Sequence, residues 1–360
     1  MVNATPNPIK EYYIAYFDIL GYRAFFDEQP EKVPELLNAI HDVIQRTKNH
    51  VGIANQSPIM NGIGDINIQT KIFSDNILAC MEASSGPLEQ IRLMAFLQIV
   101  ADIQRGFVNE YGLFVRGGIL KGELSFNDDY VFGKGLIDVV NIEEKVAIYP
   151  RIVIAADLVA YLQENPFYTQ EDYTRVVRLV QRLETKETIS PEEQAFLNEM
   201  YNKAFMLQIL ERTKAALTLQ WPDGNWVLCY LNRTSAAFLF GEVAKDSLLQ
   251  MIQSVSPFDY QLASQPPQDF DAVLSLHKNR VEEKLTRYGK NLDINTGEVK
   301  MAEIREHVLR KYIWVMAFHN LICDFYQKPE HKILTRCNCD TRFLKMTIEV
   351  LNDETGIQAN

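Results

Sequence analysis

The chain has 360 residues, 47% of them hydrophobic, which is enough to bury one large or two medium cores. Its formal net charge of −11 argues against nucleic acid as a partner, because phosphate backbones are bound by clustered Lys and Arg. No apolar run is long enough to predict a membrane span, and residues 1–8 lack a signal-peptide pattern, so we expect a cytoplasmic protein.

The N-terminal part alternates strand and helix patterns. Residues 12–18 are an aromatic and β-branched run that is typical of a buried central strand. Residues 31–49 repeat apolar side chains along one helical face, which predicts a helix. Two strands are expected at 70–73 and 77–81, joined as a hairpin by the turn sequence at 74–76.

The same alternation continues to about residue 155. Residues 87–107 predict a helix, 113–124 a long strand rich in glycine, and 130–133 a short strand. A helix at 136–148 and a strand at 149–155 follow. This order predicts an α+β fold with a ferredoxin-like core, in which a sheet containing antiparallel strands carries its helices on one face.

The rest of the chain reads as mostly helical. A hairpin is expected within 217–231, where turn residues separate two apolar runs. Long helices are expected at 272–288 and 302–326. We therefore predict a catalytic core at 1–160 and a mainly helical region with a short hairpin at 161–360.

The five cysteines show no paired spacing. Cys337 and Cys339 lack the second pair of ligands that a zinc site requires, and an odd number of cysteines does not make a disulfide framework. We expect reduced thiols.

Two aspartates, Asp18 and Asp75, each stand where a strand is expected to end. A carboxylate in that position is partly desolvated and needs a proton, a cation or a metal to offset its charge. Gly21, just after the first strand, lets backbone amides approach an anion such as a triphosphate. Metal and phosphate together indicate nucleotide chemistry, although an Asp after a strand is also a common turn or cap residue.

The order of these residues resembles that of class III nucleotidyl cyclases. The resemblance is carried by Asp18, the Ser74-Asp75 turn, residues 116–122 and the Phe132-Gly133 pair. Lys71 stands four residues before Asp75, the spacing between the family's base-selecting Lys and its second metal Asp. The chain is also similar to the pyrimidine cyclases of bacterial Pycsar anti-phage systems, through residues 17–21, 73–75, 116–119, 132–143, 147–152, 311–314 and 319–320.

This resemblance implies an enzyme that converts UTP to 3′,5′-cyclic UMP and pyrophosphate. Two Mg²⁺ or Mn²⁺ ions per site would be bound by Asp18 and Asp75, with the backbone carbonyl of Ile19 as an additional ligand. The enzyme would act as a homodimer with shared sites, and its product would act on a separate effector protein in anti-phage defence. The spacing does not separate UTP from CTP as the substrate.

The resemblance also implies which residues bind the nucleotide. The triphosphate would be held by the backbone amides of Leu20, Gly21 and Tyr22. The base would be contacted by Lys71, Tyr130 and Tyr16. The alternative is that Lys71 is a solvated strand lysine and that the two tyrosines are core or rim aromatics.

The fourth motif departs from that of purine cyclases. Where those enzymes carry an Asn and a transition-state Arg, this chain has Ile137 and Asn141. Arg23 and Arg116 are candidates for the arginine's role, and Arg116 is equally expected to be the ion-pair partner of a nearby acid. Two other functions therefore remain open: a cytidylate cyclase that makes cyclic CMP, and a degenerate cyclase fold that binds a nucleotide and regulates a partner.

Overall fold

The computed structural model describes residues 8–22, 27, 30–55, 66–86, 89–164, 169–185, 187–231, 270–289 and 299–333. Arg23, Cys337 and Cys339 lie outside these ranges. The strands are β1 (Lys10–Ile19), β2 (Ile68–Phe73), β3 (Asn76–Glu82), β4 (Val115–Phe126), β5 (Val131–Phe132), β6 (Ile152–Ile154), β7 (Thr218–Gln220) and β8 (Trp226–Leu228). The α-helices are α2 (Val33–Asn55), α3 (Glu89–Tyr111), α4 (Lys134–Lys145), α5 (Ala156–Gln163), α6 (Gln170–Glu184), α7 (Pro191–Leu217), α10 (Phe270–Gly289) and α11 (Val299–Phe325). Two short 3-10 helices, η1 (Pro30–Lys32) and η5 (Pro329–His331), complete the elements.

The ferredoxin-like core is confirmed by the strand order. The sheet runs β2-β3-β1-β4-β6-β8-β7, with β5 paired to β4 at the side. The pairs among its first four strands are antiparallel, and these strands are connected in the order β1-α2-β2-β3-α3-β4, whereas β4 and β6 are parallel. The predicted hairpins are also confirmed: β2 pairs with β3 and β7 pairs with β8. The β7-β8 hairpin pairs with β6 and so extends the same sheet.

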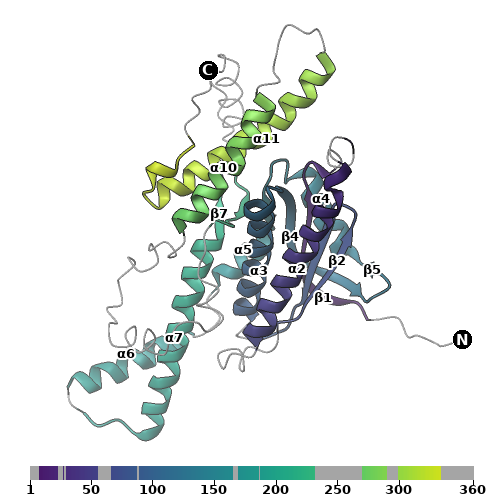
Figure 1. Ribbon diagram of the computed structural model, residues 1–360. Coiled ribbons are helices and arrows are strands. Elements are labelled where there is room, and N and C mark those ends of the chain that lie inside the picture. The colour runs from purple at the N-terminus through teal and green to yellow at the C-terminus, as the bar shows by residue number, and fades with distance from the viewer. Residues whose placement is uncertain are drawn as a thin grey trace, which may run out of the picture.

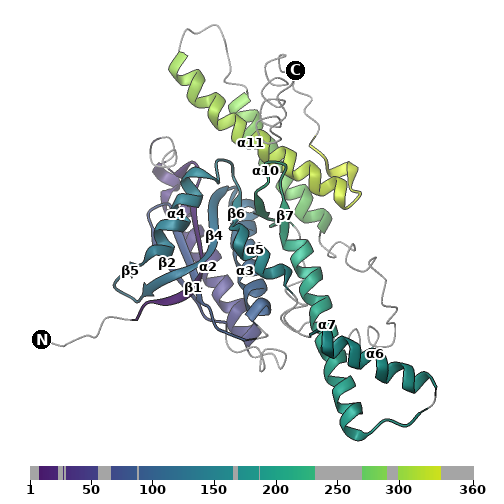
Figure 2. The same ribbon diagram turned by 180° about the vertical axis from the view of Figure 1, so that it is seen from behind.

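The two faces of the sheet are covered differently (Figures 1 and 2). Strand β1 alternates, so that Tyr13, Ala15 and Phe17 enter the large core beneath α2 and α3. The alternate residues Tyr12 and Ile14 enter a smaller core with Val139 of α4. The structure therefore has α2 and α3 together on one face, as predicted, whereas the helix predicted at 136–148 is α4 and lies on the opposite face.

Glycines allow α4 to lie very close to the sheet. A Cβ atom added to Gly135 of α4 would lie 2.4 Å from Ile14 Cδ1, and one added to Gly118 of β4 would lie 2.6 Å from Ile142 Cγ2. Real Cβ contacts are longer, so neither position accepts a side chain without movement. The glycine-rich run predicted as a strand thus sets the distance between α4 and β4.

The helical region contains two parts. Helices α6 and α7 extend away from the sheet, whereas α10 and α11 pack together beside it (Figure 1). Helix α11 contacts the core through aromatic rings: Tyr312 meets Phe114 at 5.3 Å and Trp314 meets Trp221 at 4.9 Å between ring centroids. Among the described residues, no helix combines the length and apolar character that crossing a membrane requires.

A buried polar chain joins the segment after β8 with α10, α11 and η5. The Tyr230 hydroxyl lies 2.7 Å from His277 Nε2, and His277 Nδ1 lies 3.0 Å from His319 Nδ1. The Nε2 atom of His319 lies 3.0 Å from the carbonyl oxygen of His331, which only accepts. His319 therefore donates from Nε2 and accepts at Nδ1, His277 donates from Nδ1, and Tyr230 donates to His277. The His331 carbonyl therefore fixes which atom carries the proton in each of these three side chains.

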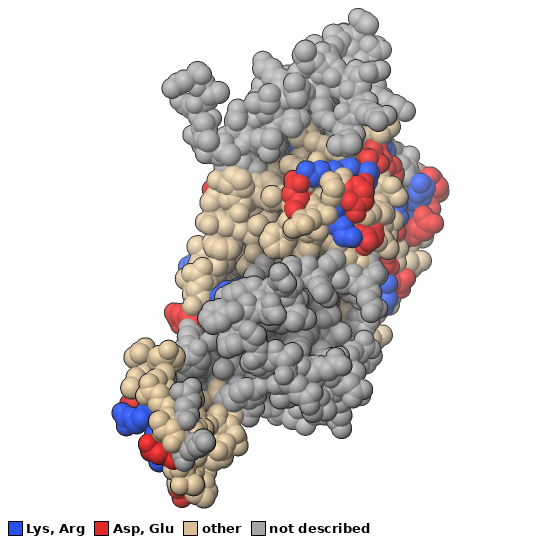
Figure 3. Space-filling model, turned by 90° about the vertical axis from the view of Figure 1, so that its left-hand side faces the viewer, with Lys and Arg blue, Asp and Glu red and all other residues tan. Residues whose placement is uncertain are grey.

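Charges are mixed on the side of the molecule that faces left in Figure 1. In the described part of that face, Lys and Arg side chains lie beside Asp and Glu side chains (Figure 3).

Candidate active site

Asp18 stands at the end of β1 between two paired strands. Its register partners are Asn76 of β3 and Arg116 of β4. Because side chains alternate along a strand, Asp18 lies on the same face as Tyr16, which is the face that α4 covers. The Asp18 side chain is 18% exposed, so its carboxylate is partly desolvated.

Asp75 lies in the turn between β2 and β3, next to the end of β1. Ser74 adopts a left-handed backbone conformation with φ of 61°, which forms the tight turn. The Asp75 carbonyl accepts a hydrogen bond from the Ile19 amide at 2.9 Å, so the turn is fastened to the residue after Asp18. The two aspartates that the sequence singled out are therefore brought to one end of the sheet.

Burial raises the pKa of Asp18 above its usual value. The charge of Arg116 opposes this rise, and the nearby charge of Asp75 adds to it. A charged Asp18 is therefore costly chiefly because it is partly buried, and the second carboxylate adds to that cost. A cation that binds between the two carboxylates would remove this penalty.

Arg116 is an ion-pair partner, which is one of the two roles that the sequence left open. Its Nε atom lies 2.7 Å from Glu143 Oε1 and 3.5 Å from Asp18 Oδ2. Glu143 comes from α4 and is only 4% exposed. Burial raises the pKa of Glu143, while Arg116 lowers it. The arginine is thus shared between a strand carboxylate and a helix carboxylate.

Sequence reasoning gave Glu143 no role. It lies one helical turn after Val139, which is buried against the sheet. An acid on the buried face of an expected helix, with an arginine on the strand beneath it, was the signal that could have identified the pair.

Helix α11 brings a second cation to this end of the sheet. Lys311 is partly buried, and its pKa is lowered by burial and by the charge of Arg116. The charges of Asp18 and Glu143 oppose this shift, so both carboxylates interact electrostatically with Lys311. In the sequence, Lys311 belongs to the C-terminal motif of the family resemblance, and it was not expected in the site.

The donor set fits a magnesium-type ion. Asp18 and Asp75 supply carboxylate oxygens, and Mg²⁺ typically binds one or two carboxylates together with waters and substrate phosphates. Glu143 is held by Arg116 instead. Asp18 and Asp75 would therefore be the side-chain ligands of such an ion, with the remaining positions open to water and phosphate.

The segment after β1 is partly engaged in backbone bonds. The Leu20 amide donates to the Phe114 carbonyl at 2.8 Å, so it can reach a phosphate only if this bond breaks. Gly21 has a φ of 81°, a conformation that favours glycine and turns the chain sharply after the strand. Tyr22 follows within the described segment.

The three expected base-binding residues lie on or near one face of the sheet. Tyr16 and Lys71 are both register partners of Leu78, from the strands on either side of it. The Lys71 ammonium donates to the Asp128 carbonyl in the β4-β5 connection, and it lies 5.8 Å from the Phe126 ring centroid. Tyr130, in the same connection, is 40% exposed. Burial, together with nearby carboxylates, raises the pKa of Tyr16 to about 12.

The positions that replace the expected Asn and Arg lie on the outer side of α4. Ile137 is 64% exposed, and Asn141 donates from Nδ2 to the Ile137 carbonyl at 2.9 Å. Neither side chain contacts the carboxylate cluster in the described contacts.

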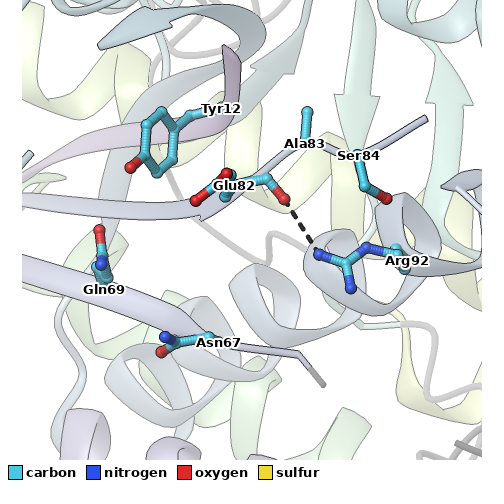
Figure 4. A pocket seen from close by; sticks show the side chains of 7 residues that line it. All are labelled: Tyr12, Asn67, Gln69, Glu82, Ala83, Ser84 and Arg92. Carbon is cyan, nitrogen blue, oxygen red and sulfur yellow. Dashed lines mark hydrogen bonds between the residues drawn. The ribbon is translucent and has the colours of Figure 1, made fainter. Parts of the chain in front are cut away.

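A pocket of about 240 Å³ lies elsewhere, near the start of β1 (Figure 4). Tyr12 and Glu82, which line it, are register partners, as are Asp18 and Asn76 at the other end of the same strand pair. In Figure 4 Arg92 donates to the backbone carbonyl of Glu82, which agrees with a separation of 3.1 Å. This pocket is separate from the carboxylate cluster.

Comparison with known proteins gave matches among solved structures. No family model matches the chain, and no curated protein is similar to it in sequence. The adenylyl cyclase CyaB from P. aeruginosa aligns with a TM-score of 0.30 and 12% identity over 44% of this chain and 83% of that chain. A class III adenylyl cyclase-like ATP-binding protein from Pseudomonas aeruginosa aligns with a TM-score of 0.29 and 12% identity, over 44% of this chain and 37% of that one.

Proposed function

We propose that this protein is a nucleotidyl cyclase that converts UTP to 3′,5′-cyclic UMP and pyrophosphate. The observation that carries the proposal is the meeting of Asp18 and Asp75 at one end of a ferredoxin-like sheet, fastened by the hydrogen bond from the Ile19 amide to the Asp75 carbonyl. Arg116 and Lys311 add positive charge beside them. Carboxylates with adjacent cations suit a substrate that is bound as a metal complex of a polyphosphate.

The reaction follows from this arrangement. When bound by Asp18 and Asp75, two Mg²⁺ or Mn²⁺ ions would promote deprotonation of the ribose 3′-hydroxyl and neutralise the departing pyrophosphate. The 3′-oxygen attacks the α-phosphorus, the bond to the oxygen shared with the β-phosphate breaks, and the hydroxyl proton passes to solvent. Arg116 Nε lies 3.5 Å from Asp18 Oδ2 and offsets part of the charge of that carboxylate.

The choice of a pyrimidine base rests on Lys71, Tyr16 and Tyr130. A lysine ammonium can donate to a pyrimidine carbonyl, and a tyrosine ring can stack on the base. Lys71 now donates to the Asp128 carbonyl, so the base would replace that acceptor or share it. Uracil and cytosine both carry the O2 carbonyl, and cytidylate cyclase activity is the alternative within the same chemistry.

Exposed apolar side chains support a homodimer. Phe132 of β5 is 71% exposed, Ile137 of α4 is 64% exposed and Phe73 at the end of β2 is 48% exposed. These three elements lie on the same side of the sheet's N-terminal half in Figures 1 and 2. Exposed apolar groups of this size are typical of interaction surfaces. A second copy placed here would lie beside Lys71 and Tyr130, which agrees with sites shared between subunits.

A second candidate is a nucleotide-binding regulator without turnover. The observation that favours it is that Arg116 is held by Glu143, while Ile137 and Asn141 stand where an Asn and an arginine were expected. On either function, the bound nucleotide or its cyclic product would signal to a separate protein. The anti-phage role of such a signal rests on the sequence resemblance alone.

One experiment separates these functions. Purified full-length protein is incubated with Mn²⁺ and each of the four NTPs, and the products are identified by mass spectrometry. We expect cyclic UMP and pyrophosphate, with no product from Asp18→Ala or Asp75→Ala, whose folding is checked by circular dichroism. Cyclic CMP as the main product would favour the cytidylate alternative. Nucleotide binding without any cyclic product would favour the regulator.

A further inference from the structure

Helix α11 is held against the strand junction that carries the site. The Tyr312 ring packs edge-on to Phe114 with 5.3 Å between ring centroids. The Phe114 carbonyl accepts the hydrogen bond from the Leu20 amide, directly after β1. Lys311 is the residue before Tyr312, so the packing that anchors the helix also fixes the start of the Lys311 side chain.

Lys311 is a partly buried cation that has no direct counter-ion among the described residues. It forms no ion pair and no hydrogen bond with another residue in the part of the chain that the structure describes. Burial lowers its pKa, and the neighbouring Arg116 lowers it further. A lysine that only solubilised the helix would face water, where it would meet neither effect.

The same helical face carries a second group that can be charged. His307 lies one turn before Lys311, and its pKa is lowered by burial and by the charges of Lys311 and Arg116, among others. A lowered pKa leaves His307 neutral at neutral pH, so the positive charge of this surface, opposite the acidic end of the sheet, comes from Lys311. Such a surface suits an anion that reaches the carboxylates through bound metal.

We propose that Lys311 binds the polyphosphate of the substrate, so that the helical C-terminal region completes the active site. This inference rests on the proposed nucleotide function and extends it, because it assigns phosphate binding to a helix that lies outside the ferredoxin-like core. The lysine ammonium acts as a point charge on phosphate oxygens.

The charges in the site also set a condition for binding. Asp18, Asp75 and Glu143 are three acids, whereas Arg116 and Lys311 are two cations. Without a divalent ion, the site would repel a polyphosphate. With divalent ions on the carboxylates, Lys311 and the ions attract the same ligand, so binding through Lys311 requires metal.

The test uses the full chain and inorganic tripolyphosphate as the probe, measured by isothermal titration calorimetry with and without Mn²⁺. Lys311→Met keeps the side-chain length and removes the charge, whereas Lys311→Arg keeps the charge. Lys10→Met, at the far end of β1, is the matched control for loss of one cation, since Lys10 pairs with Glu82 there.

We expect Mn²⁺-dependent binding that Lys311→Met weakens at least about tenfold, the size of one lost charge-assisted contact. The affinity of Lys311→Arg for tripolyphosphate should stay within about threefold of the wild-type affinity, and that of Lys10→Met should equal the wild-type affinity. A wild-type affinity in Lys311→Met would overturn the proposal. So would equal losses in Lys311→Met and Lys10→Met.

Folding is controlled in the same samples. The thermal midpoint of Lys311→Met should equal or exceed that of the wild type, because burial disfavours the charge that it removes. If Lys311→Met unfolds, Lys311→Gln takes its place with the same expected loss. Cyclic product from the wild type with unaltered affinity in the Lys311 variants would refute this inference and leave the proposed function standing. Binding of tripolyphosphate that depends on Lys311, without cyclic product from any NTP, would support this inference and refute the proposed cyclase activity.

Discussion

Asp18 and Arg116 are direct register partners across β1 and β4, with 3.5 Å between Asp18 Oδ2 and Arg116 Nε. The same Nε atom lies closer to Glu143, at 2.7 Å. One guanidinium therefore serves two partly buried carboxylates, and Asp75 adds a third negative charge beside them. This shortage of positive charge is the physical basis of the metal assignment, and it makes the carboxylates' behaviour measurable without any assay of activity.

Removing the Asp18 charge should stabilise the metal-free protein. The pKa of Asp18 is raised in the folded state. The contribution of its neutral form to folding stability is therefore fully present below the unfolded-state pKa, and it is lost as the pH rises through the folded-state pKa. At neutral pH in EDTA, Asp18→Asn should raise the melting temperature, at about 2–4 °C per kcal/mol relieved.

Divalent ions should remove the advantage in melting temperature that Asp18→Asn has over the wild type in EDTA. Mg²⁺ or Mn²⁺ should raise the melting temperature of the wild type and leave that of Asp18→Asn nearly unchanged. Asp138→Asn, which removes an exposed acid that pairs with Lys134, is the control and should respond to metal like the wild type. A metal response of Asp18→Asn equal to the wild type's would contradict the assignment of Asp18 as a ligand.

The base preference should depend on Lys71 and Tyr130. Lys71→Ala or Tyr130→Ala should reduce the ratio of kcat/KM for UTP to that for the other NTPs by about tenfold or more, because a lost polar contact to the base separates substrates while phosphate contacts serve them all. Lys121→Ala, on β4 and paired with Glu11, is the control. If both variants kept the UTP preference, these residues would be structural and Tyr16 would become the next candidate for base contact.

Complementation should reveal shared sites. Asp75→Ala homodimers should be inactive and Lys71→Ala homodimers should turn over UTP poorly, and mixing them should raise the rate on UTP, since one of the two sites in a heterodimer would have an intact metal pair and an intact base contact. The readout is cyclic product after subunit exchange, with dimer mass checked by light scattering. Full activity in a sample that contains only monomer would rule out this arrangement.

The close approach of α4 to the sheet should not tolerate an added methyl group. Gly135→Ala should lower the free energy of unfolding by about 1–3 kcal/mol, the usual cost of overpacking a core. Gly52→Ala is a matched control in α2, because a Cβ there meets no atom within 4 Å. It should raise stability by up to about 1 kcal/mol, since Ala favours a helix over Gly. Chemical denaturation measures both, and equal effects would mean that α4 is free to shift.

The buried histidine chain predicts loss of stability in mild acid. Burial lowers the pKa of His319 from 6.5 to about 4, so the unfolded state binds the proton first. Stability is therefore highest above pH 6.5 and falls as pH drops toward 4, by about 3 kcal/mol at about 1.4 kcal/mol per pKa unit. His277 adds to this fall, because burial also lowers its pKa.

His319→Gln tests the source of this effect. It should be less stable than the wild type at pH 7.5 by about 1–3 kcal/mol, because the bonds to His277 and the His331 carbonyl are disturbed. Between pH 6.5 and 4, however, its unfolding free energy should fall less steeply than that of the wild type. Parallel pH profiles would place the acid sensitivity in other groups.

Local patterns were sufficient to predict most of the core. The alternation in β1, the turn that contains Asp75 and the helical periodicities of α2 and α3 are properties of neighbouring residues, and the structure has these elements where the sequence indicated them. The ferredoxin-like strand order also followed, because it depends on the succession of elements. The two carboxylates were identified for the same reason, since each marks the end of its own strand.

The remaining parts of the site depend on packing between distant segments. Glu143 meets Arg116 only because glycines at 118 and 135 let α4 lie directly on β4, on the face opposite α2 and α3. The Leu20 amide is engaged by Phe114, a partner that no local pattern reveals. The charge of Lys311 interacts with those of the carboxylates because Tyr312 packs on Phe114, which lies far away in the sequence. Local sequence sets which surfaces are apolar and where chains turn, whereas side-chain charges interact through space, so the tertiary structure alone decided which charges neutralise one another.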